Sequence, residues 1–178
     1  MQLVVPLTAL LGLLAVAGLT KIIRPATGSE AVAALLPRRL RPEAARAVLR
    51  VVGVAELAVA AAGLASSTRV AGVLVAVAYA ALTGIALRLK HVAPTASCGC
   101  AGGDAPVSTA HVVINALGAT TGIGAAVLTS ARIPHLLTHQ HGPAAAVLAA
   151  VLAFLVAGAM NLAGLRVHTP AVKQFGPA

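Results

Sequence analysis

The sequence predicts an all-α membrane protein, with a four-helix transmembrane bundle followed by a fifth, C-terminal transmembrane helix. Of its 178 residues, 59% are hydrophobic and only 10% are charged, and the mean hydropathy is +0.95. Such a chain has too little polar sequence to cover the surface of a soluble domain. Five apolar stretches each approach the roughly 20 residues that a helix needs to cross a bilayer. They are continuous rather than alternating, which favours helices over a barrel.

The first apolar stretch, residues 3–23, is expected to be a retained span and not a cleaved signal peptide. It has no basic leading region, and it runs on to Lys21 without a convincing cleavage site. A long, proline-interrupted connection follows it. Within this connection the stretch SEAVAALLP begins with a candidate helix cap at Ser29. The apolar residues behind Ser29 predict a short helix that lies in the membrane interface.

Four further spans are predicted along the chain, at residues 48–66, 70–89, 108–129 and 144–165. Their interiors are rich in Ala, Val and Gly, and small residues let membrane helices approach closely, so we expect a tight bundle. The connection before the fourth span carries the two cysteines, and the connection before the fifth carries three histidines. The chain therefore divides into two parts: a four-helix membrane domain over residues 1–130, and a histidine-containing loop, additional span and short tail over residues 131–178.

The net charge of +9 does not indicate nucleic-acid binding. Two Phe, one Tyr and no Trp leave few surfaces on which bases could stack. The basic residues lie between apolar spans, where contact with lipid headgroups and membrane orientation account for them. If five spans alternate, ten of the 13 Lys and Arg residues share one side with the cysteine loop. This excess predicts that the cysteine loop is cytoplasmic, in the plasma membrane of a bacterium.

Four polar residues within the predicted spans are candidates for a functional site, because such groups are costly in a bilayer and usually face the bundle interior. Glu56 lies within the second span and Lys21 near the same end of the first, so a pair would reduce the cost of burying either. His111 and Asn115 are four residues apart and share one helix face. The alternatives are a Lys21 that snorkels to the interface, a Glu56 at the lipid edge and an interfacial His111.

Cys98 and Cys100 are the only cysteines, and Gly99 alone separates them. A disulfide between them would close a small strained ring, and strained disulfides are easily reduced. A switchable dithiol is one interpretation. A second is a soft metal such as Cu(I), bound by both thiolates with His91 or His111 as a third ligand. A third is a pair of inert, buried small residues.

Three sequence blocks carry a resemblance to a known family. They are GLTKIIRP from Gly18, AEL around Glu56, and CGCAGGDAPVSTAHVVINALG from Cys98. Over roughly the first 130 residues the chain resembles the MauE branch of the DoxX-like membrane proteins, although Ala101 stands where that family usually has an aromatic residue. The resemblance implies a four-helix membrane domain linked to thiol–disulfide chemistry, with a thioredoxin-like partner. It also implies a redox site outside the cytoplasm, opposite to what the charge distribution predicts.

The leading hypothesis is therefore a membrane thiol–disulfide redox protein in which Cys98 and Cys100 exchange electrons with a thioredoxin-like partner. Under their loop we expect a pocket for protons or for a quinone-like electron carrier, lined by Lys21, Glu56, His111 and Asn115. No motif in the sequence identifies a quinone. The competing classes are a membrane protein that binds or transports a soft metal or small solute, and a structural membrane subunit without chemistry.

Overall fold

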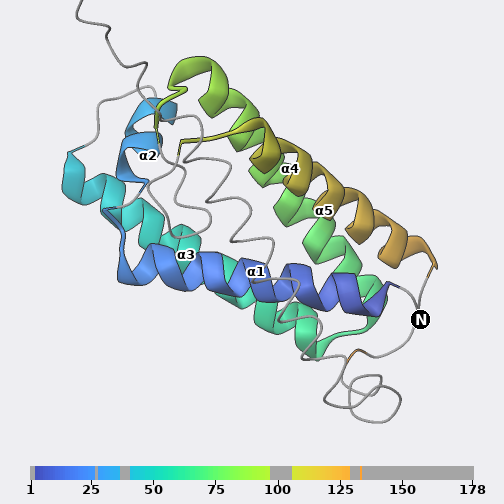
Figure 1. Cartoon of the computed structure of the whole chain (residues 1–178). Coiled ribbons are helices and arrows are strands. Elements are labelled where there is room, and N and C mark those ends of the chain that lie inside the picture. Colours follow the sequence, from blue (N-terminus) through green and yellow to red (C-terminus); the bar gives the residue numbers. More distant parts are fainter. Residues whose placement is uncertain (1–2, 27, 37–40, 97–105, 129–132, 134–178) are drawn as a thin grey trace, which may run out of the picture.

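The computed structural model describes residues 3–26, 28–36, 41–96, 106–128 and 133, and the regular elements within them are α-helices (Figure 1). Four of these helices are long and apolar enough to cross a membrane. This confirms the prediction of an all-helical, four-span membrane bundle. The long helices are α1 (Val4–Ile23), α3 (Pro42–Ala65), α4 (Thr68–Val92) and α5 (Thr109–Leu128), and the short helix is α2 (Ser29–Leu35).

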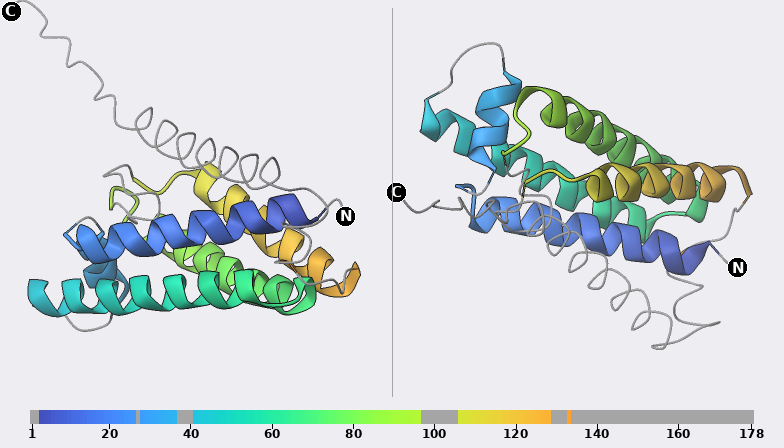
Figure 2. Two further views of the ribbon diagram at one scale, coloured as in Figure 1. Left: turned by 90° about the horizontal axis from the view of Figure 1, so that it is seen from below. Right: turned by 45° about the horizontal axis from the view of Figure 1, so that its top comes forward.

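The long helices alternate in direction along the bundle (Figure 2). As a result, the C-terminal ends of α1 and α4 lie at the same end of the bundle as the N-terminal ends of α3 and α5. We call this the loop end, because residues 97–105, with both cysteines, connect α4 to α5 there. Cys98, Cys100 and the predicted fifth span at residues 144–165 lie outside the described residues.

Helix α3 begins at Pro42, six residues before the predicted start of its span at residue 48. Pro is favoured at the first helical position, and Glu43 in the first turn complements the positive end of the helix dipole. The alanines that follow are strong helix formers. Hydropathy alone does not reveal this first part, since Glu43 and Arg46 lower its apolar character.

Helix α2 is present where a short helix was predicted, but the expected cap at Ser29 is wrong. Ser29 is the first helical residue, and Gly28 occupies the cap position with φ at 92°. This left-handed conformation is accessible to glycine without steric cost. The Ser29 hydroxyl donates instead to the carbonyl oxygen of Ala26, at 2.8 Å.

Two pairs of glycines mark the closest helix contacts. A Cβ placed on Gly18 of α1 would lie 2.6 Å from the carbonyl oxygen of Gly53 in α3, and a Cβ on Gly53 would lie 2.6 Å from that of Gly18. The same holds for Gly72 of α4 and Gly122 of α5, since a Cβ on either glycine would lie 2.7 Å from the carbonyl oxygen of the other. Larger side chains at these positions would force the backbones apart, so the glycines set how closely α1 packs on α3 and α4 on α5.

The buried apolar residues form two clusters. The cluster further from the loop end joins α1, α4 and α5, and it consists of Leu7, Leu11, Ala71, Val75, Tyr79, Ala125 and Ile133. The second cluster lies at the loop end, where it packs α2 against α4 and against the residues on either side of the cysteine segment. It consists of Ala31, Ala86, Leu89, Ala96 and Val107.

Candidate functional site

Lys21 and Glu56 form an ion pair inside the bundle. The Lys21 ammonium nitrogen lies 2.8 Å from Oε1 and 2.6 Å from Oε2 of Glu56. Lys21 is 4% exposed and Glu56 is 8% exposed. Lys21 therefore does not snorkel to the membrane interface, and Glu56 does not lie at the lipid edge. Each charge is satisfied by the other, which offsets much of the cost of taking both out of water.

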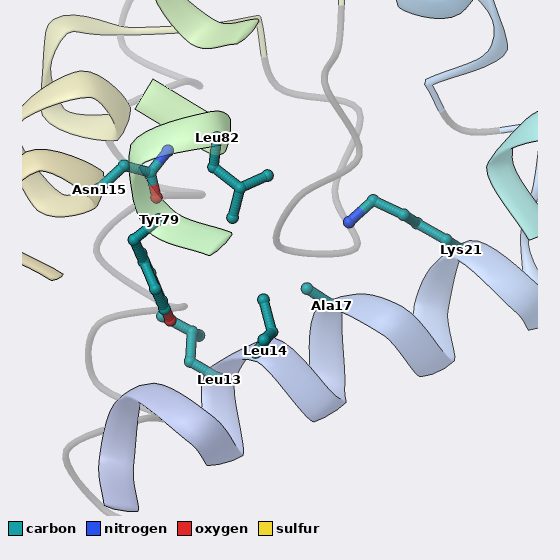
Figure 3. Close-up of a pocket in the computed structure, with 7 residues that line it drawn as sticks. All are labelled: Leu13, Leu14, Ala17, Lys21, Tyr79, Leu82 and Asn115. Atoms are coloured by element: carbon teal, nitrogen blue, oxygen red, sulfur yellow. The ribbon is translucent and has the colours of Figure 1, made fainter. Parts of the chain in front are cut away.

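The glycine contact between α1 and α3 explains why these two charges meet. Lys21 follows Gly18 by three residues, and Glu56 follows Gly53 by the same spacing. A Cβ on Gly53 would lie 3.2 Å from the Lys21 Cβ, and one on Gly18 would lie 3.1 Å from the Glu56 Cβ. Helical side chains lean toward the N-terminus of their helix. The Lys21 side chain accordingly runs back along α1, toward the bundle interior (Figure 3).

A small cavity lies beside the ion pair. Its volume is about 10 Å³, roughly what a single water molecule requires. Lys21 of α1 and Asn115 of α5 supply its polar groups, and Asn115 is only 4% exposed. Both side chains point into the same space (Figure 3). The other lining residues are Leu13, Leu14 and Ala17 of α1 and Tyr79 and Leu82 of α4.

His111 lies one helical turn before Asn115, but it does not line this cavity. It is 3% exposed, so it lies inside the bundle and not on its outer surface. The backbone N–H of Ser108 donates to His111 Nδ1 at 3.2 Å, and the Ser108 hydroxyl lies 2.9 Å from the same nitrogen. A backbone N–H can only donate, so Nδ1 is the acceptor. Ser108 and His111 thus close the start of α5 in the manner of a capping box, with His in the usual place of Glu or Gln.

The two flanks of the cysteine segment are anchored at the loop end. Ala96 precedes residues 97–105 and Val107 comes shortly after them, and both are buried in the same apolar cluster as Ala31 and Leu89. In addition, the Lys90 ammonium donates to the Thr109 hydroxyl at 2.9 Å, which joins the last turn of α4 to the first residue of α5. The chain therefore enters and leaves the cysteine segment in the half of the bundle that contains the ion pair.

The structure adds residues that the sequence analysis did not single out. Tyr79 lines the cavity, donates its hydroxyl to the carbonyl oxygen of Leu10 at 2.9 Å, and packs its ring where a Gly118 side chain would be. One signal could have identified it, because Tyr79 is the only tyrosine of the chain and lies within a span. The apolar lining residues carry no comparable signal, since Leu and Ala occur throughout the spans.

The described ranges contain no group of three His, Cys, Asp or Glu side chains that could hold a metal ion. His111, offered above as a possible third ligand beside the cysteines, has its Nδ1 occupied by Ser108. Its Nε2 is the nitrogen that could take part in other chemistry.

Comparison of the sequence with known protein families identifies a family model that covers these residues. The family model described as methylamine utilisation protein MauE matches residues 2–131. Searches of curated proteins and of solved structures find no match. The matched range includes the four membrane helices, the ion pair, Asn115, His111 and the cysteine segment.

Proposed function

Because this chain belongs to the MauE family of multi-pass membrane proteins, whose description names methylamine utilisation, we propose that it is a membrane thiol–disulfide redox protein. Cys98 and Cys100 exchange electrons with a thioredoxin-like partner. The observation that supports the proposal is the placement of the residues that flank the Cys-Gly-Cys segment. This segment connects α4 to α5 in the sequence, and the buried residues on its two sides, Ala96 and Val107, lie at the end of the bundle that contains Lys21, Glu56 and Asn115.

The proposed reaction moves two electrons and two protons. The thiolate of one cysteine attacks a disulfide of the partner, forms a mixed disulfide and releases one partner thiol. The second cysteine then attacks the mixed disulfide, so that Cys98 and Cys100 become joined and the second partner thiol leaves. The partner is reduced and this protein is oxidised; the reverse sequence oxidises the partner. Gly99 between the cysteines permits the backbone angles that such a small ring needs.

In the reverse sequence, which oxidises the partner, Cys98 and Cys100 end as a dithiol. A second electron carrier must then oxidise this dithiol back to the disulfide, and we propose a quinone for this role. A quinone takes two electrons and two protons from the dithiol and becomes a hydroquinone, which balances the reaction. Lys21, Glu56, His111 and Asn115 are the groups available to handle these protons. The cavity between Lys21 and Asn115 is too small for a quinone ring, so the quinone would bind outside it, within the reach of the cysteine loop.

Thiol trapping in native membranes tests this function. Free thiols are alkylated with a reagent of large mass after acid quenching, with and without prior mild reduction. We expect Cys98 and Cys100 to be blocked together in the oxidised state and to become reactive together after reduction. In Cys98→Ser or Cys100→Ser, the remaining thiol cannot be resolved, and a mixed disulfide with the partner should accumulate.

Ser97→Ala is the matched control, because it alters the residue beside Cys98 and leaves both thiols in place. It should behave like the unaltered protein. Two thiols that never form a reversible disulfide in membranes would disprove the redox function. If the purified protein then held a soft metal that Cys100→Ser removes, the metal-binding alternative would replace it.

A further inference from the structure

The Lys21 ammonium has one more hydrogen to donate than Glu56 accepts. An ammonium group carries three N–H donors, and the two Glu56 oxygens take two of them at 2.6 and 2.8 Å. Among the described residues, the structure gives Lys21 no other hydrogen-bond acceptor. Lys21 is 96% buried and lines the cavity, so a molecule inside the cavity can accept a hydrogen bond from this third donor.

Asn115 faces the same cavity from α5, and its side-chain amide has no hydrogen-bond partner among the described residues. Its side-chain amide has two donors and an acceptor, the residue is 4% exposed, and no hydrogen bond joins that amide to another side chain in the part of the chain that the structure describes. Leaving such groups without a partner inside an apolar site is costly. Two buried polar groups from different helices thus point into one small space (Figure 3).

We propose that this cavity is a binding site for a single water molecule, which accepts a hydrogen bond from Lys21 and is held by the Asn115 amide. The volume of about 10 Å³ matches the space that one water molecule needs. Water also matches the chemistry of the walls, because it both donates and accepts hydrogen bonds. An anion is disfavoured, since Glu56 already balances the charge of Lys21. The apolar side chains of Leu13, Leu14 and Leu82 line other parts of the cavity.

Such a water would give the buried ion pair a route for proton exchange between α1 and α5. Asn115 lies one turn from His111, so a proton that reaches this water is close to the start of α5 and to the loop end. Use of the water by the cysteines rests on the proposed redox function. The water site itself does not, because it is built only from Lys21, Asn115 and their apolar neighbours.

The small number of lysines makes a direct test possible. The chain has three lysines, Lys21, Lys90 and Lys173, so ¹⁵N-lysine labelling gives three ammonium signals in a solid-state NMR spectrum of the protein in lipid bilayers. Loss of one signal in Lys21→Arg identifies the buried group. We expect magnetisation to pass from water to the Lys21 ammonium, although this residue is buried from bulk solvent.

Two substitutions should abolish that transfer while leaving the Lys90 signal unchanged. Ala17→Leu fills the cavity and keeps both polar groups, and Asn115→Leu removes one of the two groups that hold the water. Ala58→Leu is the matched control, because Ala58 is exposed on α3 and away from the cavity, and there the transfer should persist. If Asn115→Leu fails to fold, Ala17→Leu alone decides the question.

Absence of transfer to Lys21 in the unaltered chain would overturn the water site. So would a transfer that survives Ala17→Leu, since water would then reach Lys21 by another path. The same spectra can be recorded on the Cys98→Ser/Cys100→Ser variant, which has no thiol chemistry. A water contact that persists in this variant supports the site even where thiol trapping disproves the redox function.

Discussion

At the scale of single residues, Lys21 and Glu56 satisfy their charges with each other inside the bundle, through two contacts of 2.6 and 2.8 Å. Removing one member leaves the other as an unpaired charge in a region with little water. The expected loss for a broken buried pair is about 3–5 kcal/mol, whereas replacing both members with apolar residues removes the unpaired charge as well. The pair should therefore behave as a unit in mutagenesis.

We expect Lys21→Met and Glu56→Leu each to lower the free energy of unfolding by about 3–5 kcal/mol, and the double variant to lose less than either single one. Unfolding by SDS in mixed micelles measures all three. Lys90→Met is a suitable control, since Lys90 makes one hydrogen bond to Thr109 near the surface and should cost no more than about 1 kcal/mol. Additive losses in the double variant would show that the two charges do not stabilise each other.

At the scale of helices, the crossing of α1 and α3 depends on Gly18 and Gly53. A Cβ on either glycine would lie 2.6 Å from the backbone oxygen of the other, which is far too close for a real contact. The helices would have to separate, and the separation would act on Lys21 and Glu56, which lie one turn away. The glycines thus support the ion pair without touching the charged groups themselves.

We predict that Gly18→Ala and Gly53→Ala each destabilise the bundle by about 1–3 kcal/mol, as overpacking of a tight contact usually does. Gly84→Ala in α4 is the matched control, because no atom lies within 4 Å of a Cβ at that position. It should be neutral, or stabilising by up to about 1 kcal/mol, since Ala is the better helix former. The same SDS titration compares the three variants, and equal effects at Gly18 and Gly84 would refute the role of the crossing.

Helix α5 shows how a local signal can be present in the sequence and still be missed. The stretch STAH from Ser108 has the spacing of a capping box, but its fourth residue is His rather than Glu or Gln. The sequence predicts a pocket role for His111, because it is a polar residue in a span and shares a helix face with Asn115. The structure instead directs its Nδ1 to the Ser108 backbone and leaves Asn115, one turn later, to face the cavity.

At the scale of the whole molecule, the described basic residues gather at the loop end. Besides Lys21, which pairs with Glu56, six of them lie there, and Arg69 lies at the opposite end, in the first turn of α4. The six are Arg24, Arg41, Arg46, Arg50, Arg88 and Lys90. From the positive-inside rule we predict that the loop end faces the cytoplasm and that Arg69 faces the outside.

Labelling intact cells with a membrane-impermeant thiol reagent after reduction tests this orientation. We expect Cys98 and Cys100 to be protected. In the Cys98→Ser/Cys100→Ser background, the single cysteine of Arg69→Cys should be labelled, because residue 69 is exposed at the other end of the bundle. The reverse pattern would place the redox pair in an oxidising compartment, as the family resemblance implies. Equal labelling of both positions would contradict the number of spans between them.

The sequence by itself determined the membrane class, the four described spans and the half of the bundle in which the polar residues lie. These properties follow from hydropathy, charge and alternation of spans, all of which can be read along the chain. Helix ends were less certain: α3 extends to Pro42 because helix propensity continues where hydropathy falls. Depth in the membrane also limits the partners of Lys21 and Glu56, since two buried charges at the same depth in a bundle have few partners other than each other.

Only the tertiary structure decided which polar groups share a site. His111 and Asn115 lie on one face of α5, yet one caps the helix and the other meets Lys21 across a cavity. Spacing along a helix fixes a residue's face and depth, but its neighbours depend on how the helices rotate and cross. Here that crossing is set by backbone contact between Gly18 and Gly53, two residues with no side chain that could signal it in the sequence.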